Sequence, residues 1–384
     1  MTDTELLARM VAWRRHLHQH PETAFEEIET ARFVAATLRE LGWDVHEHIG
    51  RTGVVGTMTR GDGPAVALRA DMDALPIAEA NTCEHRSRHD GRMHACGHDG
   101  HTTMLLGAAA LLAQDAGWQG TVRLIFQPAE EVAGGGRVML DDGLFERFPC
   151  EAVFGLHNWP GLPLGRIALN PGAMMASFDT FEIRVDGRGS HAAMPEEGID
   201  ALVCASHVVI ALQTIVSRRL SPKAAAVVSV TQIHGGEAWN VLPDCAVIRG
   251  TVRCFDPDVR LRVRASIDEI AAGTAYALGA TATVSHKDGY PATINSPRIA
   301  EIARDAARAT LGDDAVVVGC EPSMASEDFA FLANAKPGAY VWLGVDGGHR
   351  GAPLHNPHYD FNDDALMIGA SYWVNVVKTF GRTR

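Results

Sequence analysis

Residues 121–131 have the sequence TVRLIFQPAEE. The apolar run in this stretch is short, ends at a proline and is followed by two adjacent carboxylates, Glu130 and Glu131. Short apolar runs that end in turn signals are typical of buried parallel strands. In open α/β sheets, sites assemble in the crevice beyond the carboxyl ends of such strands. The stretch therefore predicts an α/β fold with a polar site at one edge of its sheet.

Two further segments place ligand-type residues at the ends of strand-like runs. Residues 66–68 lead to Asp71 and Asp73, and residues 152–156 lead to His157. Any one of these groups is better explained as a helix cap or a water-facing side chain. The three segments together are better explained by strands that deliver carboxylates and imidazole to one sheet edge.

Residues 94–101, HACGHDGH, contain three histidines, a cysteine and an aspartate. The segment that follows, residues 102–113, is apolar nearly all round and rich in helix formers, which predicts a buried helix. Cys96 and His98 then lie at or just before its N-terminus, where the helix dipole favours a thiolate. Thiolate, imidazole and carboxylate all bind zinc, manganese and related metals. A buried free cysteine with surface histidines is the alternative, but the nearby carboxylate pair favours a metal site.

A last candidate ligand lies near the C-terminus. Residues 353–361, PLHNPHYDF, follow a strand-like run at 339–344 and precede a helix that begins near Asn362. A proline-rich turn after a strand can fix a histidine as a ligand, so we expect His355 at the site. His358 is the alternative occupant, with an outer or solvent-facing position.

Composition limits the classes of protein. The chain has 384 residues, enough for about two or three domains. Its net charge of −13 argues against a nucleic-acid binder, which needs clustered Lys and Arg. Seven scattered cysteines are typical of a reducing cytoplasm. The N-terminus lacks a signal-peptide pattern, and no apolar run approaches the ~20 residues that span a bilayer. We expect a cytoplasmic protein that contacts neither nucleic acid nor membrane.

The order of predicted helices and strands changes near residue 178. Up to that residue, helical and strand-like segments alternate, as in an α/β sheet. The next segments follow in the order βαββαβ, which indicates a ferredoxin-like split unit, and the α/β pattern then returns. No candidate metal ligand lies within that unit. The predicted fold is therefore a discontinuous α/β catalytic domain, with a mixed sheet and flanking helices, and an inserted α+β ferredoxin-like domain. The predicted boundaries are 1–178 and 292–384 for the catalytic domain and 179–291 for the insertion.

The ordered motifs resemble those of the M20 metallopeptidase superfamily. Within it the chain is similar to the aminoacylase-like amidohydrolases, namely hippurate hydrolases, N-acyl-amino-acid deacetylases and auxin-conjugate hydrolases. The resemblance covers almost the whole chain. It rests on HLHQHPE (16–22), RADMDALP (69–76), HACGHDGH (94–101), QPAEE (127–131), GLH (155–157), GSHAAMP (189–195), NVLPD (240–244), SEDF (326–329) and LHNP (354–357).

The resemblance implies two divalent metal ions per subunit. It implies that they are bound by Cys96, His98, Glu131, His157 and His355. The Cys96 thiolate then bridges the pair, and Glu130 is the general base. Zinc or manganese suits these ligands, as do cobalt and nickel.

One position departs from the pattern. The wider superfamily has a metal-binding histidine where this chain has Asp71, two residues before the aspartate that matches Asp73. Asp73 is expected to support catalysis by orienting a ligand imidazole, and the departure leaves the roles of both aspartates open.

The same resemblance gives the insertion a role. It implies that the insertion is a lid that also forms a homodimer interface, and that His191 serves the metal site of the partner subunit as an oxyanion donor. It also implies that Asn240 and His191 contact substrate. A solvated turn for His191 and a structural turn for Asn240 are the alternatives that the residues alone allow.

The implied reaction is metal-dependent hydrolysis of the amide bond of N-acyl amino acids, which releases a carboxylic acid and a free amino acid. A dinuclear metallo-exopeptidase acting on dipeptides is the alternative activity. A rival mechanism is a cysteine hydrolase with Cys96 as nucleophile and His98 or His101 as base. A third reading, a metal-dependent binding or sensor protein, fits poorly because Glu130 is retained. The sequence leaves open the acyl group, the amino acid and the metal.

Overall fold

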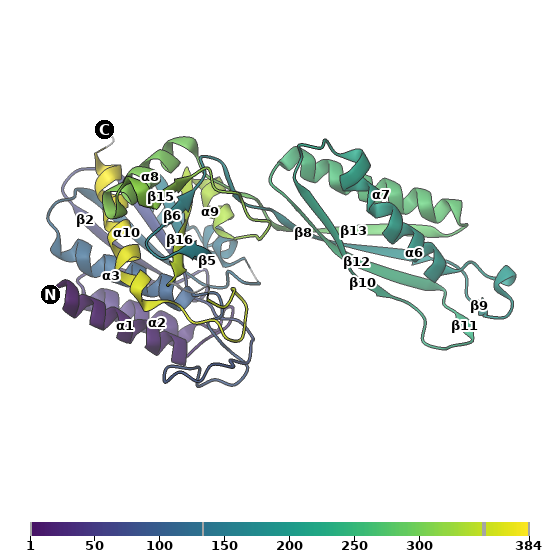
Figure 1. Cartoon of the computed structure of the whole chain (residues 1–384), viewed down its shortest axis with the longest axis horizontal. Coiled ribbons are helices and arrows are strands. Elements are labelled where there is room, and N and C mark those ends of the chain that lie inside the picture. The colour runs from purple at the N-terminus through teal and green to yellow at the C-terminus, as the bar shows by residue number, and fades with distance from the viewer. Residues whose placement is uncertain (1, 133, 348–350, 383–384) are drawn as a thin grey trace. The chain divides into compact units, whose positions relative to one another are not determined.

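The computed structural model describes residues 2–132, 134–347 and 351–382. Among these residues, a mixed sheet of eight strands has the order β1-β2-β4-β3-β5-β16-β6-β15 (Figure 1). The central strands β4, β3, β5 and β16 run parallel to their neighbours in this series, so their carboxyl ends meet at one edge. The strands are Asp44–Ile49 (β1), Gly53–Arg60 (β2), Ala65–Asp71 (β3), Gly120–Gln127 (β4), Ala152–Pro163 (β5), Ile167–Leu169 (β6), Val316–Val318 (β15) and Gly338–Asp346 (β16).

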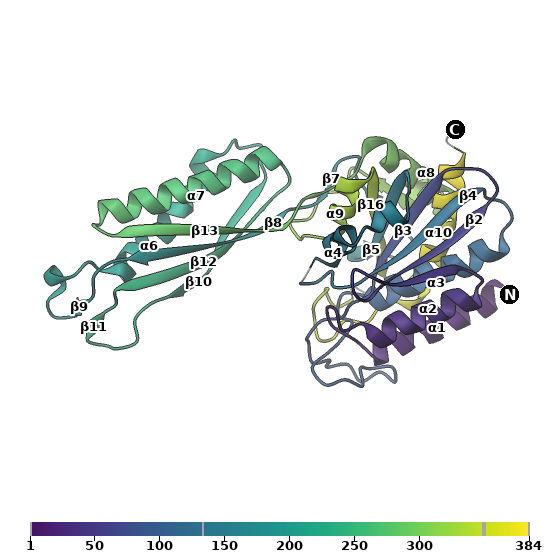
Figure 2. The ribbon, with the colours of Figure 1, turned by 180° about the vertical axis from the view of Figure 1, so that it is seen from behind.

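Helices flank this sheet. The helix α3 packs against α1 and α10, and α10 packs against α8, while the short helices α4 and α9 pack on each other (Figures 1 and 2). Because α3 is apolar nearly all round, it is buried along most of its length, as its sequence predicts. The helices are Asp3–Gln19 (α1), Ile28–Glu40 (α2), His98–Gln114 (α3), Gly135–Asp141 (α4), Leu144–Arg147 (α5), Pro297–Leu311 (α8), Phe329–Ala335 (α9) and Leu366–Gly381 (α10).

A second, antiparallel sheet has the order β10-β12-β8-β13. Its strands and two helices follow in the chain as βαββαβ, which confirms the predicted ferredoxin-like arrangement. They are Phe178–Asp186 (β8), Ala201–Leu212 (α6), Ala226–His234 (β10), Cys245–Cys254 (β12), Pro257–Ala277 (α7) and Thr281–Tyr290 (β13). A small two-stranded sheet, Ser190–His191 (β9) with Val241–Leu242 (β11), belongs to the same part of the chain. The short strands Ala173–Met175 (β7) and Thr293–Ile294 (β14) form another two-stranded sheet.

Two compact units result, each with its own apolar core. The first unit consists of Met1–Met174, Ile294–Glu321 and Asp328–Arg384, and the second of Met175–Thr293 with Pro322–Glu327. The predicted fold class, a discontinuous α/β part with a mixed sheet plus an inserted α+β part, is confirmed. None of the helices in the described residues is long and apolar enough to cross a membrane.

One detail of the predicted edge is wrong. His157 was expected just past the end of a strand, but β5 continues through it to Pro163. The pairing of β5 with β3 ends at Gly155, whereas its pairing with β16 continues, with His157 opposite Trp342. Because β16 supplies backbone partners beyond the end of β3, β5 extends past Gly155, and His157 lies within the strand.

The start of α3 is fixed by a glycine. Gly97 precedes the helix with φ of +89°, and a Cβ at this position would lie 2.4 Å from Oδ1 of Asn158. Only glycine meets both requirements without strain. The close approach sets His98, the first residue of α3, beside β5.

Candidate metal centre

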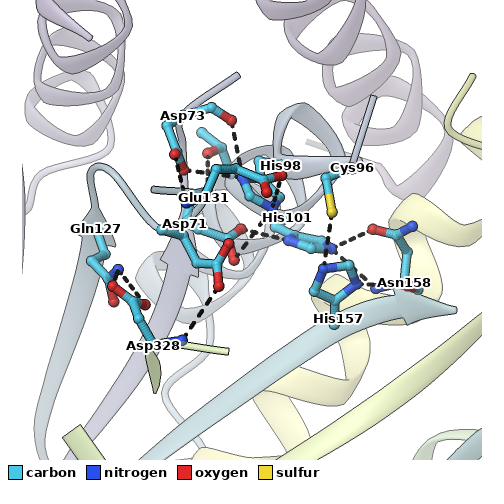
Figure 3. A network of polar contacts seen from close by, with 12 residues as sticks. Asp71, Asp73, Cys96, His98, His101, Gln127, Glu131, His157, Asn158 and Asp328 are labelled. Carbon is cyan, nitrogen blue, oxygen red and sulfur yellow. Dashed lines mark hydrogen bonds and ion pairs between the residues drawn. The ribbon is translucent and has the colours of Figure 1, made fainter. Parts of the chain in front are cut away.

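The structure brings together all five residues predicted as metal ligands. Donor atoms of Cys96, His98 and His157 lie within 4.8 Å of one another, as do those of Cys96, Glu131 and His355. Figure 3 shows four of these side chains converging from the start of α3, the loop after β4, and β5. His355 comes from the loop after β16. Cys96 belongs to both groups of three, so it is the donor that the two groups share.

His98 presents one nitrogen to the cluster. Its Nδ1 lies 2.9 Å from the backbone oxygen of Asp73 and 3.1 Å from Oδ1 of the same residue. The backbone carbonyl oxygen and the ionised carboxylate oxygen of Asp73 can only accept hydrogen bonds, so Nδ1 carries the proton and donates it. The buried Nε2 has no hydrogen-bond partner in the described part of the chain. It points to the other donors, as expected for a ligand whose second nitrogen is held by a carboxylate and a carbonyl.

Glu131 and His355 face each other. Oε2 of Glu131 lies 3.3 Å from Nε2 of His355, and the buried Oε1 of Glu131 has no hydrogen-bond partner among residues 2–132, 134–347 and 351–382. His355 has φ of +62°, and its N–H donates to the oxygen of Ala95 at 2.8 Å. A left-handed conformation is costly for a residue other than glycine, and such strain often occurs at functional sites.

Cys96 and His157 form the third contact. Nδ1 of His157 donates to the backbone oxygen of Asn158 at 2.7 Å, which leaves the Nε2 lone pair 3.5 Å from Sγ of Cys96. His157 therefore has the tautomer that a metal ligand requires.

The electrostatics of the cluster suit a cation. Burial, together with the carboxylates of Glu131 and Glu130, raises the pKa of the Cys96 thiol well above its usual range. Burial acts to lower the pKa of His98, but the carboxylates of Asp71 and Asp73 outweigh it and raise that pKa to about 10. Burial and the neighbouring His101 hold the pKa of His157 well below its usual range. A metal ion that binds here must displace a proton from Cys96 and from His98. Its positive charge would offset the nearby carboxylates, which favour the protonated forms of both residues.

The donor set passes two further tests of fit. Soft sulfur, imidazole nitrogen and carboxylate oxygen together match zinc and similar divalent ions. Buried polar atoms without partners are rare, and here His98 Nε2 and Glu131 Oε1 both border the cluster.

A second Cys–His–Asp group, Cys83, His85 and Asp360, fits a metal less well. The guanidinium of Arg14 occupies it: Nη1 donates to Oδ1 of Asp360 at 2.8 Å, and Nη2 lies 3.3 Å from Nε2 of His85. A cation already neutralises the carboxylate, so the cluster around Cys96 is the better candidate.

Asp71 belongs to a buried network that adjoins the cluster, since its Oδ2 lies 3.8 Å from Nε2 of His98. Nη1 of Arg69 donates to Oδ2 of Asp71 at 2.7 Å, and Nδ1 of His101 donates to Oδ1 at 2.6 Å. Nε2 of His101 accepts the N–H of Asn158 at 3.0 Å. Both nitrogens of His101 are therefore engaged by the protein, and Asp71 is neutralised by its neighbours.

This arrangement does not support a cysteine hydrolase. The imidazole nitrogen 3.5 Å from Sγ of Cys96 is Nε2 of His157, which is neither of the two predicted bases. His98 lies within 4.8 Å of the thiol, and both nitrogens of His101 contact other residues. A nucleophilic cysteine needs a lowered pKa, whereas burial raises that of Cys96.

Glu130 lies beside the cluster, and it is Glu131, not Glu130, that faces His355. A carboxylate oxygen of Glu130 lies within 4.8 Å of the donor atoms of His98 and Glu131, and its Oε1 accepts the N–H of Asp328 at 3.3 Å. Asp328 in turn accepts from Arg69 at 2.9 Å. A buried carboxylate next to a metal cluster is placed to exchange protons.

The remaining predicted residues lie elsewhere. His191 and Asn240 are neighbours in the second unit, where His191 in β9 pairs with Val241 in β11, and the N–H of Ala192 donates to the oxygen of Asn240 at 3.0 Å. His358 is exposed, and its N–H donates to Oδ1 of Asn356 at 2.9 Å.

Asn158 and Arg69 also belong to the surroundings of the centre, although no sequence pattern predicts it. Both contact their partners across long separations in the chain, such as Arg69 with Asp328. The blocks RADMDALP and SEDF contain Arg69 and Asp328, so a motif signal existed, but nothing in the sequence pairs the two residues.

Comparison with known proteins identifies relatives over nearly the whole chain. Residues 67–379 match peptidase family M20/M25/M40. An N-acetyl-L-cysteine deacetylase of Bacillus subtilis is 41% identical over 369 residues, which cover 95% of this chain and 86% of the relative. A hippurate hydrolase of Campylobacter jejuni is 41% identical over 364 residues, 94% of each chain. The crystal structure of the Bacillus subtilis YXEP protein, described as a dinuclear metal binding peptidase, superposes with a TM-score of 0.88 at 36% identity and full coverage of both chains.

Proposed function

Because the chain belongs to peptidase family M20/M25/M40, we propose that it is a metal-dependent amidohydrolase that cleaves the amide bond of N-acyl amino acids. The products are a carboxylic acid and a free amino acid. The observation that carries the proposal is the convergence of five metal-type donors beside a further carboxylate, Glu130. Relatives with the printed activities of an N-acetyl-L-cysteine deacetylase and a hippurate hydrolase support this substrate class.

Two divalent metal ions are the proposed cofactors. Their ligands are Cys96, His98, Glu131, His157 and His355. Because Cys96 belongs to both groups of three, its thiolate would be available to either ion. Zinc or manganese is the proposed metal, and cobalt or nickel suits the same donors. When bound, such a pair polarises a substrate carbonyl and lowers the pKa of water toward about 7.

The protein's own residues supply the proton transfers and the orientation. Glu130 is the proposed general base: its carboxylate takes a proton from the attacking water and passes it to the leaving amine. Asp73 accepts from His98 and fixes that imidazole with Nε2 toward the cluster. Glu131 differs from Glu130 in facing His355, so the adjacent carboxylates have different tasks.

The test is a panel of substrates assayed on protein reconstituted with zinc or manganese. The panel contains N-acetyl, N-benzoyl and indole-acetyl amino acids, together with dipeptides. We expect the N-acyl amino acids to be hydrolysed with higher kcat/KM than dipeptides of similar size. A preference for dipeptides would instead indicate an exopeptidase, and binding without turnover of any of them would indicate a binding protein.

We further propose a homodimer formed through residues 179–291, in which His191 donates to the developing oxyanion at the partner's site and Asn240 contacts substrate. The support is that these two residues are neighbours in the second unit and that His191 is exposed. Loss of one oxyanion donor costs about 10²–10³-fold in kcat. Mixtures of inactive His191→Ala and inactive Glu130→Gln subunits should regain activity. Demonstrated subunit exchange without regained activity would refute the role in trans.

The proposed location is the cytoplasm. All seven cysteines lie among the described residues, and each is a free thiol. Free thiols are typical of proteins in a reducing compartment.

A further inference from the structure

A buried glutamate lies outside the set of residues considered so far. Glu27 has no exposed surface and directly precedes α2. Its side chain makes no capping hydrogen bond to that helix. Instead Oε1 accepts the N–H of Ala129 at 2.9 Å, and Oε2 accepts the hydroxyl of Thr52 at 2.7 Å. The carboxylate therefore connects the start of α2 to the loop after β4.

The contact at Ala129 is next to the proposed base. Ala129 has φ of +53°, a left-handed conformation that is costly for a residue with a side chain. Its carbonyl accepts the N–H of Gly135 at 3.0 Å, while its N–H donates to Glu27. The peptide groups on both sides of Ala129 are therefore fixed, and the chain leaves this residue toward Glu130 in one direction.

A second carboxylate holds the other side of Glu130. The N–H of Glu131 donates to Oδ2 of Asp73 at 3.0 Å. Two buried acids, Glu27 and Asp73, therefore accept the backbone N–H groups of Ala129 and Glu131, the residues on either side of Glu130. This clamp explains how adjacent side chains can diverge, with Glu131 opposite His355 and Glu130 against the N–H of Asp328.

We propose that Glu27 is a positioning residue for the general base, and that its carboxyl oxygen sets the direction of Glu130 through the amide of Ala129. This inference rests on the proposed function of Glu130. Glu27 is not one of the proposed metal ligands, and it acts through its hydrogen bond with Ala129.

The position of Glu27 is unfavourable for stability alone. Burial, together with the negative charge of Asp73, raises the pKa of Glu27 to about 7. A buried acid beside another acid, without a capping bond to its helix, is poorly explained as a stabilising group. The contact with Ala129 gives it a role that an apolar side chain could not fill.

Three variants separate positioning from packing. Glu27→Met removes both acceptors at similar volume, and we expect kcat to fall about 10–100-fold because small misplacements of catalytic groups cost this much. KM and the metal content should stay near the wild-type values. Glu27→Gln keeps an acceptor for Ala129 and a donor for Thr52, so it should retain most of the turnover. Thr52→Val, the matched control, removes the other hydrogen bond to the Glu27 carboxylate and should also retain most of the turnover.

The double variant tests the route of the effect. In a Glu130→Gln background, Glu27→Met should cause no further loss of residual turnover, because its effect passes through Glu130. An equal loss in both backgrounds, an unchanged kcat in Glu27→Met, or loss of metal from it would overturn the inference. If Glu27→Met fails to fold, Glu27→Asp takes its place, since the shorter side chain withdraws the acceptor but keeps the charge.

Different results would remove the role of Glu130 and the role of Glu27. Substantial turnover by Glu130→Gln alone removes the proposed base and with it the proposed mechanism. An inactive Glu130→Gln combined with wild-type turnover in Glu27→Met leaves the mechanism in place and removes only the positioning role.

Discussion

Replacement of Asp73 by asparagine should weaken metal binding, because one carboxylate supports two proposed ligands. Oδ1 of Asp73 accepts from Nδ1 of His98 at 3.1 Å, and Oδ2 accepts from the N–H of Glu131 at 3.0 Å. An asparagine has a single side-chain oxygen. In either orientation its amide nitrogen, which only donates, faces an N–H that also donates.

The size of the effect follows from what remains. Nδ1 of His98 keeps a second acceptor, the backbone oxygen of Asp73 at 2.9 Å. The asparagine oxygen should therefore turn to Glu131, and only the bond to His98 is replaced by a repulsive contact. Loss of such supporting partners costs 10–100-fold in metal affinity, so we expect about tenfold for Asp73→Asn and about 100-fold for Asp73→Ala. Tenfold corresponds to about 1.4 kcal/mol.

The assay is titration of metal-free protein with zinc in competition with a chromophoric chelator, with Asp62→Asn as the control. Asp62 is exposed, so this control removes the same charge without touching the centre. Wild-type affinity in Asp73→Asn would refute the reasoning from the two hydrogen bonds. Equal weakening in Asp62→Asn would show that net charge, not orientation, is responsible.

Three further predictions concern stability, pH and metal content. Gly97→Ala should lower the free energy of unfolding, measured by urea titration, by about 1–2 kcal/mol because a left-handed φ is costly for alanine. The loss should exceed that of the control Gly279→Ala, since Gly279 also has a positive φ, +78°, but a Cβ there would have no atom within 4 Å, whereas a Cβ at Gly97 would clash with Asn158. Equal losses in the two variants would refute the role of the clash. The folded-state pKa of Glu27 is raised from 4.5 to about 7, so the folded state retains a proton that the unfolded chain has lost, and this group's contribution to stability falls as pH rises from about 4.5 to 7. Glu27→Gln lacks this titrating group. Between pH 5 and 8 its free energy of unfolding in urea titrations should therefore rise relative to that of the wild type, on the order of 2–3 kcal/mol. A difference in unfolding free energy that stays constant with pH would refute the raised pKa of Glu27. Cys96→Ala and Glu131→Gln should each contain fewer than two metal ions per chain by elemental analysis, and two full ions in both would show that the proposed ligand set is wrong.

Local sequence patterns predicted the elements that carry the centre. The apolar runs predicted β3 and β4, and the Ala- and Leu-rich segment predicted α3. Cys96 and His98 were expected at or just before the start of that helix, and His98 is its first residue. Such patterns work because burial on one or all faces of an element leaves a periodic or continuous apolar signature. The βαββαβ order was predictable for the same reason, since its strands and helices each have a buried face.

Contacts between distant segments could not be predicted in this way. The extension of β5 through His157 depends on its neighbour β16, about 180 positions later in the chain. The contact of Glu27 with Ala129 joins residues 102 positions apart, and a glutamate before a helix has the appearance of an ordinary N-terminal residue. The pattern shows which side chains can act, but packing decides which backbone amide each of them meets.

The central claim is that turnover requires a dinuclear metal centre with Glu130 as base. The direct measurement is titration of metal-free protein with zinc or manganese while the hydrolysis of N-benzoylglycine or N-acetylcysteine and the bound metal are followed together. The account predicts that activity is absent without metal and reaches its plateau at about two bound ions per chain. It also predicts that Glu130→Gln binds the same two ions with kcat lower by about 10²–10⁴-fold. Full hydrolysis by metal-free protein, or wild-type turnover by metal-loaded Glu130→Gln, would contradict it.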